Sequence, residues 1–191
     1  MNMPSASPAP GFSMIEVLVT LIILVVGILG LFGLSARLQQ HQLEAYQRAQ
    51  ALMLLKDMEN RIAANPLNAH DYATGSTTPI AANGICPTAS STRQQQDALA
   101  WCTEIVGAGE TDNNANVGAL IHGLGCIENL GGTNPNGPYL VTVAWQGMTA
   151  LGPPLGSPCG AGAYNTLAGC ANDACRRTVS TTVRIANLAT P

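Results

Sequence analysis

The longest apolar segment of the chain lies near its N-terminus. Residues 17–34 read VLVTLIILVVGILGLFGL, which is 18 positions with no charged residue and a single threonine. Together with residues 12–15 they form an apolar stretch that only Glu16 interrupts with a charge. At a rise of about 1.5 Å per residue, a helix over this stretch is roughly 30 Å long, which matches the hydrocarbon core of a bilayer. The pattern predicts a membrane-spanning helix over residues 12–36.

The helical pattern continues beyond the apolar stretch. Residues 35–65 contain no Gly or Pro and are rich in Ala, Leu, Gln, Glu, Arg and Met, which are favourable helix formers. Apolar residues recur every three or four positions, the spacing of one helix face: Ala45, Ala49, Leu52, Leu55, Met58 and Ile62. We expect one continuous helix of about fifty residues, amphipathic over residues 37–66 and ended by Asn65 and Pro66.

Residues 67–191 are rich in Gly, Asn, Thr, Ser and Pro and favour strands. Residues 139–146 (YLVTVAWQ) and 177–185 (RTVSTTVRI) alternate and carry β-branched side chains, and residues 126–129 form a shorter third candidate. A short helix is expected over residues 92–106, a turn over 131–138, and irregular structure over 147–175. The chain is therefore predicted to be an α+β protein, with a long helix packed on a small antiparallel sheet in a globular head.

Composition excludes several classes of protein. Of the 191 residues, 47% are apolar and only 10% are charged, so the chain is neither a disordered tail nor a solvated coiled coil. The net charge of -3 lacks the basic excess of a nucleic-acid binder. Aromatic residues make up 4%. A head with so few large side chains is expected to need covalent staples, and Trp101 and Trp145 are expected in its core.

All six cysteines lie in the predicted head. Disulfides there require an oxidising compartment, and six cysteines allow many pairings. Cys86 and Cys102 are the most natural local pair, and the remaining four are expected to clamp the Gly-rich loop onto the sheet: Cys126, Cys159, Cys170 and Cys175. The alternative is a zinc site, but the spacing of Cys170 and Cys175 matches zinc knuckles poorly and the histidines are scattered, so no metal is expected.

The sequence gives little support for catalysis. Ser157 and Ser180 have no evident His or Asp companions along the chain. The Gly-rich pieces at residues 123–125 and 160–162 lack the strand–helix context of phosphate-binding loops and read as turns. We expect a protein that is not an enzyme and that binds no cofactor.

Three features occur together at the start of the apolar stretch. Gly11 directly precedes it and offers an endopeptidase an unhindered backbone, Glu16 is the one ionisable residue before Arg37, and the apolar run follows the candidate cut instead of preceding it. A cleaved signal peptide would have an apolar region of about 7–15 residues and a basic start, which residues 1–11 lack.

Glu16 has two interpretations. It sits in the first helical turn, where the helix dipole favours an acid, or it attracts the new amine of Phe12 on a neighbouring subunit.

The segment GFSMIEVLVTLIILVVGILGL resembles the prepilin N-terminus of type IV pilins and type II secretion pseudopilins. This resemblance implies that a membrane aspartyl prepilin peptidase removes residues 1–11, cuts between Gly11 and Phe12 and methylates the amine of Phe12. It implies further that Glu16 sets the register between subunits, and that the chain adopts the type IV pilin fold.

Residues 34–66, YLVTVAWQG and the terminal CRRTVSTTVRI are similar to PilV-type minor pilins, also called type IV pilus modification proteins. The resemblance implies an inner-membrane subunit with a periplasmic head that enters an extracellular pilus and helps initiate its assembly. Its partners would be the prepilin peptidase, other minor pilins, the major pilin and the inner-membrane assembly platform. A type II secretion pseudopilin is the alternative, and a DNA-uptake or adhesive minor pilin ranks below both.

Gly27, Gly30 and Gly33 recur every three residues within the apolar stretch. Small residues allow neighbouring helices to approach closely, and Gly33 stands where major pilins usually carry a kinking Pro. Ordinary use of glycine in membrane helices explains the same pattern equally well.

Overall fold

The computed structural model describes residues 11–109, 111–113, 115–116, 120–166 and 168–185. The chain divides into two compact units, one ending at Gln42 and the other beginning at Leu43. Each unit is described by itself.

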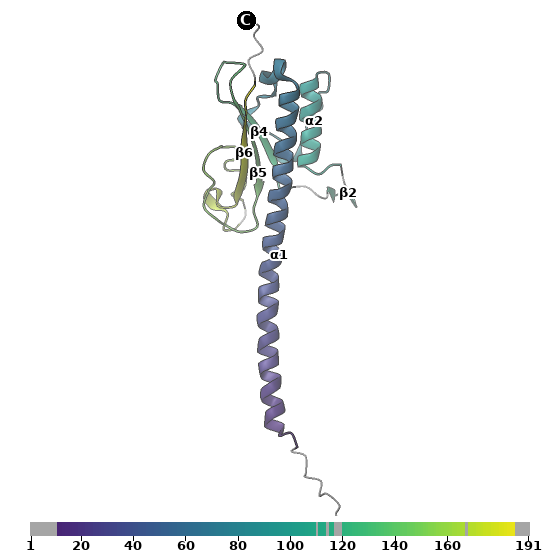
Figure 1. Ribbon diagram of the computed structural model, residues 1–191, viewed down its shortest axis with the longest axis vertical. Coiled ribbons are helices and arrows are strands. Elements are labelled where there is room, and N and C mark those ends of the chain that lie inside the picture. Colours follow the sequence, from purple (N-terminus) through teal and green to yellow (C-terminus); the bar gives the residue numbers. More distant parts are fainter. Residues whose placement is uncertain (1–10, 110, 114, 117–119, 167, 186–191) are drawn as a thin grey trace, which may run out of the picture. The chain divides into compact units, whose positions relative to one another are not determined.

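The first unit consists, in the residues described, of the N-terminal part of a single long helix. Helix α1 runs over Met14–Ala64, which is 51 residues without a break (Figure 1). The prediction of one continuous helix is confirmed, although it begins at Met14 instead of Phe12. Gly27, Gly30 and Gly33 leave the helix unbroken. The 3₁₀ helix η1 (Pro66–Tyr72) follows after Asn65, as expected where a proline lies just past a helix end.

The second unit is built on a four-stranded antiparallel sheet in the order β1-β4-β5-β6. Its strands are β1 (Gly75–Ile80), β4 (Leu124–Asn129), β5 (Tyr139–Gln146) and β6 (Arg176–Val183). The α+β prediction is confirmed, and the predicted strand at residues 139–146 has the bounds of β5. The other two expected strands are found with ends shifted by one or two residues.

Strand β1 was not expected from the sequence. It contains Pro79, and proline removes a donor from the ladder. The structure places β1 at an edge of the sheet, where its register against β4 shifts between Gly75 and Ile80. A second sheet consists of two short strands, β2 (Thr111–Asp112) and β3 (Ala115–Asn116).

Helix α2 (Arg93–Ile105) confirms the short helix expected near residues 92–106. Thr92 caps it: its side chain accepts from the backbone N–H of Gln95, whose own side chain accepts from the N–H of Thr92. The indole of Trp101 is fully buried and donates to the carbonyl oxygen of Leu54 at 2.9 Å. Trp145 is 3% exposed. Both tryptophans therefore belong to the core, as predicted.

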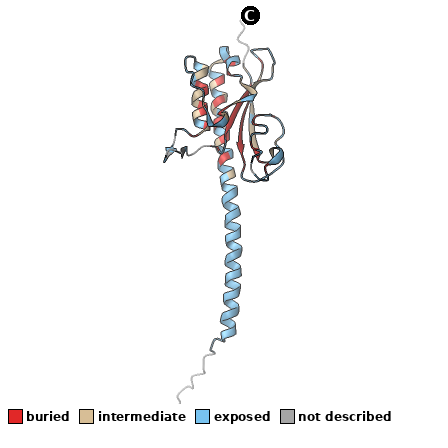
Figure 2. Cartoon of the chain, turned by 180° about the vertical axis from the view of Figure 1, so that it is seen from behind, coloured by how far each residue is buried: buried red, intermediate tan, exposed pale blue. Residues whose placement is uncertain are grey.

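The buried face of α1 differs from the predicted one. Leu55, Met58 and Ile62 are buried as expected, but Ala45, Ala49 and Leu52 are exposed. Gln47, Ala51 and Leu54 are buried in their place. Figure 2 shows that the buried positions of α1 lie on the part of the helix beside the sheet. The helix carries apolar residues on two faces, and the head packs on the face that Leu54 and Leu55 share.

Both faces of the sheet are covered. One contributes Ile127, Val141, Val143 and Trp145 to the main core with α1 and α2. The other forms a smaller core with the connection between β5 and β6, over residues 147–175: Leu124, Cys126, Ala144, Cys159 and Tyr164. The irregular connection is therefore a second layer of the head, which explains why nearly every residue of β5 is buried.

Gly125 does not lie in a turn, so the interpretation of residues 123–125 as turn glycines is wrong at this position. It is in β4, where a Cβ would overlap the indole of Trp101 and approach Cδ1 of Ile105 to 2.9 Å. The missing side chain lets the Trp101 ring lie directly against the strand.

Candidate functional site

The residues that carry the processing and assembly predictions lie together at the start of α1. Gly11, Phe12 and Ser13 precede the helix, and Glu16 occupies its first turn. The backbone N–H of Glu16 donates to the carbonyl oxygen of Ser13 at 3.0 Å. All four residues are exposed, with Phe12 at 86%. The expected leader falls on residues 1–11, of which 1–10 lie outside the described residues.

The apolar part of α1 has no cover within its own unit. Over its most apolar window of 18 residues the mean hydropathy is 3.0, and 0% of that window is buried. An exposed apolar area of this extent marks a surface that contacts lipid or other protein. By length and composition the helix could span a membrane or act as a signal anchor.

The three glycines of this segment also face open space. A Cβ built on Gly27, Gly30 or Gly33 meets nothing within 4 Å. Each step of three residues turns the helix position by about 60°, so the three follow a slanted band. Both interpretations of these glycines stay open, because each site has room for either a neighbouring helix or lipid.

The six cysteines form three disulfides in the head: Cys86–Cys102, Cys126–Cys159 and Cys170–Cys175. The predicted local pair Cys86–Cys102 is confirmed and joins the segment after β1 to α2. Cys126–Cys159 clamps the β5–β6 connection onto β4, as expected of the remaining four. The expectation is wrong for Cys170–Cys175, which spans only 5 residues and closes a small loop just before β6.

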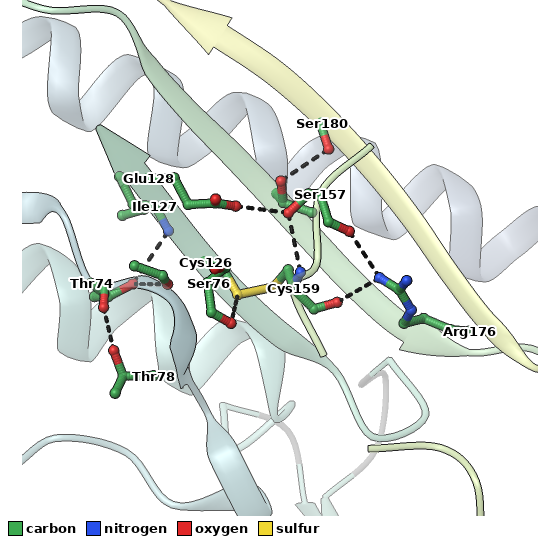
Figure 3. The surroundings of a disulfide bond; sticks show 12 residues. Thr74, Ser76, Thr78, Cys126, Ile127, Glu128, Ser157, Cys159, Arg176 and Ser180 are labelled. Atoms are coloured by element: carbon green, nitrogen blue, oxygen red, sulfur yellow. Dashed lines mark hydrogen bonds between the residues drawn. A yellow bond between two sulfur atoms is a disulfide. The ribbon is translucent and has the colours of Figure 1, made fainter. Parts of the chain in front are cut away.

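Hydrogen bonds surround the clamp that Cys126–Cys159 forms (Figure 3). Ser157 Oγ donates to Glu128 Oε1 at 2.8 Å and accepts from the backbone N–H of Cys159 at 3.2 Å. The buried guanidinium of Arg176 donates to the carbonyl oxygens of Ser157 and Cys159 at 2.9 and 3.0 Å. Ser157 is thus engaged in holding the connection against the sheet, which is a structural role.

An ionic cluster that the sequence did not reveal joins α1, η1 and α2. The carboxylate of Asp97 is 4% exposed and accepts from Arg61 and Arg93, each at 3.2 Å. It also accepts from the phenol of Tyr72 at 2.6 Å. Burial, reinforced by this hydrogen bond, raises the pKa of Tyr72 to about 12. Arg61 and Tyr72 are far from Asp97 in sequence, so only the fold brings them to this carboxylate.

A second contact that was not predicted involves Glu44, near the start of the second unit. Its Oε1 accepts from the backbone N–H of Met148 at 3.0 Å and lies 3.5 Å from Arg177 Nη2. Arg177 in turn donates to the carbonyl oxygen of Thr149 at 2.6 Å. Glu44 therefore ties the β5–β6 connection to α1.

Within the described residues, no group of three or more His, Cys, Asp or Glu side chains is arranged to hold a metal ion. Ser180 shares a 2.9 Å hydrogen bond with Thr142 on the neighbouring strand.

No protein-family model, curated protein or solved structure matches the chain.

Proposed function

We propose that this chain is a minor pilin, a structural subunit that enters a type IV pilus and helps initiate or modify its assembly. It is anchored in the inner membrane by the first half of α1, with its head on the periplasmic side. The proposal includes processing between Gly11 and Phe12, which leaves the apolar helix on the product.

The observation that carries the proposal is the bare apolar surface of α1, starting directly after Gly11 and Phe12 and bearing one acid. A helix kept only as a membrane anchor needs no acid among its first apolar residues, because a carboxylate in hydrocarbon costs several kcal/mol. An acid stabilises the packing of such a helix beside the helices of other subunits, because the acid of one subunit can pair with the amine of another.

The pairing fits the position of Glu16. Cleavage after Gly11 creates an α-amine on Phe12, four residues before Glu16 and outside the first turn of the helix. In a medium of low dielectric constant an ion pair is strongly favoured over an unpaired charge. The packing register that brings the amine of one subunit to Glu16 of its neighbour would therefore be favoured over every register that leaves these two groups apart.

The head supplies the surfaces that other subunits contact. Three disulfides and the Asp97 cluster make it rigid, and α1 leaves part of its second half uncovered. The exposed residues there include Ala45, Tyr46, Ala49, Leu52 and Met53. In the proposed function these side chains face neighbouring pilins.

Intact-mass analysis tests the proposal. The chain is purified from cells with and without a prepilin peptidase. We expect the peptidase to remove residues 1–11 and to add one methyl group to the new N-terminus at Phe12. Gly11→Val, which places a branched side chain at the cut, should remain unprocessed, and Gly109→Val serves as a matched control in the head. A mature protein that keeps its first eleven residues, or is released without α1, would overturn the proposal.

A further inference from the structure

The head contains a pocket that no part of the proposed function uses. Its volume is about 380 Å³, at the lower end of the roughly 300–1,000 Å³ typical of small-molecule sites. Five segments line it: the 3₁₀ turn η2 (Ala82–Gly84) after β1, the end of α2, strand β3, the residues that lead into β4, and the β5–β6 connection.

The pocket has an apolar floor and a polar rim. Leu120, Leu124 and Tyr164 on the floor are each less than 8% exposed. Asn83, His122, Thr166 and Asn116 on the rim are all exposed. A ligand of this site therefore needs one apolar face and several polar groups along its edge.

The described part of the lining consists of apolar and uncharged polar side chains together with His122. Among the described residues that line the pocket there is no Asp, Glu, Lys or Arg. A phosphate or carboxylate would find no cation, and an ammonium group would find no anion, so charged ligands would leave water without compensation. The ligand that fits is neutral.

The rim both donates and accepts hydrogen bonds. The amide of Asn83 has two donor hydrogens and an acceptor oxygen. His122 Nδ1 lies 2.7 Å from Gln146 Oε1. When Nδ1 carries the proton of this bond, Nε2 of the neutral ring is an acceptor. Groups that donate and accept at once, such as hydroxyls, match this rim.

The walls are fixed before any ligand arrives. Ala81, Asn83 and His122 have positive φ values of 68°, 54° and 47°, a conformation that Asn and His tolerate but that an alanine adopts only where the surrounding structure favours it. Cys86–Cys102 fastens the wall after β1 to α2, and Cys126–Cys159 fastens the opposite wall to β4. A pre-formed site binds without the cost of ordering loops.

We propose that this pocket binds a neutral pyranose, either free or as the terminal unit of a glycan. The C–H face of the sugar ring lies on the apolar floor, against the exposed atoms of Leu120 and Leu124, and its hydroxyls meet Asn83 and His122. This assignment does not rest on pilus assembly, because the pocket lies wholly in the second unit.

The experiment uses the full chain in a detergent without a sugar headgroup, since glycosidic detergents would compete. Galactose, N-acetylgalactosamine, glucose and mannose are titrated by saturation-transfer difference NMR, with N-acetylneuraminic acid as the charged comparison. We expect saturable binding of at least one neutral sugar, at least tenfold tighter than that of the acid. Absence of binding by all four neutral sugars, or equal binding of the acid, would overturn the assignment.

Two variants and one matched control locate the binding. Ala163→Trp fills the pocket from its exposed wall, while Ala161→Trp places the same side chain on an exposed position outside the lining. We expect the first to weaken binding at least tenfold and the second to leave it unchanged. Asn83→Gly removes the rim amide at a residue whose φ of 54° glycine adopts readily. It should weaken binding severalfold without lowering the melting temperature, and unchanged affinity in Ala163→Trp and Asn83→Gly would contradict the proposal.

Discussion

The phenol oxygen of Tyr72 lies 2.6 Å from Oδ2 of Asp97, at the junction of α1, η1 and α2. Asp97 is almost fully buried, and its other contacts are to Arg61 and Arg93. A buried carboxylate is tolerated only when it is paired and hydrogen-bonded. The Tyr72 contact is therefore part of what allows a charged residue to sit inside the head.

Replacing Tyr72 with Phe should destabilise the head modestly. The change removes the hydrogen bond to Asp97 and the 3.3 Å hydrogen bond that Tyr72 accepts from Asn65, but it leaves both arginine contacts. We therefore expect a loss of about 1–2 kcal/mol in the free energy of unfolding. Denaturant unfolding of the full chain in detergent measures it. Tyr46→Phe is the control, because Tyr46 is 52% exposed, and an equal loss in both variants would contradict the role given to Asp97.

The free energy of unfolding should fall at high pH as the phenol of Tyr72 loses its proton. Burial and the Asp97 contact raise the pKa of Tyr72 from 10.0 to about 12. Because the folded state holds this proton more tightly than the unfolded state, the stabilisation is complete below pH 10 and is lost as the pH rises towards 12. The free energy of unfolding should decline less steeply over this range in Tyr72→Phe than in the unmodified protein. Identical pH profiles would show that Tyr72 titrates alike in both states.

Gly125→Ala should be poorly tolerated. Its Cβ would overlap the Trp101 ring, and relieving the overlap requires the ring or the strand to move, at a cost of about 1–3 kcal/mol. Gly109→Ala is the matched control, since a Cβ there meets nothing within 4 Å. Thermal unfolding compares the two variants. Equal melting temperatures would mean that the indole is not packed against β4.

The disulfides should contribute unequally to stability. Cys126–Cys159 spans 33 residues and Cys170–Cys175 spans 5. The loop-closure model assigns about 4 kcal/mol to the first and about 2 kcal/mol to the second. Replacing each pair by alanine and comparing denaturant unfolding tests this order. A larger loss from removing Cys170–Cys175 would contradict it.

Glu16→Ala should separate synthesis from assembly. The variant keeps the apolar helix, so the proposed function requires normal membrane insertion and processing. It also requires at least tenfold less protein in sheared pili, because the proposed pairing with the Phe12 amine of a neighbour is lost. Immunoblotting of the membrane and pilus fractions measures both. Glu59→Ala, at a half-buried position of the same helix, should enter pili normally. Normal incorporation of Glu16→Ala would remove the assembly role from this residue.

The sequence predicted the elements whose signal is local. The 51 residues of α1 contain no proline, and β5 alternates clearly between its two faces. The capped start of α2 and the local cysteine pair were also accessible, because each depends on residues close together in the chain. The predictions that failed, such as the buried face of α1, depend on contacts between residues that are far apart in the sequence.

The buried face of α1 illustrates this limit. The helix has apolar residues on two faces, one including Ala49 and Leu52 and the other including Leu54 and Leu55. Periodicity identifies both but cannot decide which one the head covers. That choice is made by Trp101, whose indole donates to the backbone of α1 at Leu54.

The candidate sites show the same contrast between local sequence signals and contacts between distant residues. Gly11, Phe12 and Glu16 were found because they form one short motif. Asp97, Glu44 and the pocket were missed, since their partners lie tens of residues away along the chain. The one signal for the buried cluster is the position of Asp97 four residues before Trp101, which places the carboxylate on the same face of α2 as an expected core residue.

The β5–β6 connection, which covers one face of the sheet, makes completion of the fold depend on a disulfide. Residues 147–175 are held on β4 by Cys126–Cys159, and that bond forms only under oxidising conditions. In reducing surroundings this bond is absent, and the layer over Leu124 and Ala144 keeps only its non-covalent contacts, such as the hydrogen bond between Ser157 and Glu128. Completion of the head is thereby coupled to the redox environment in which the chain folds.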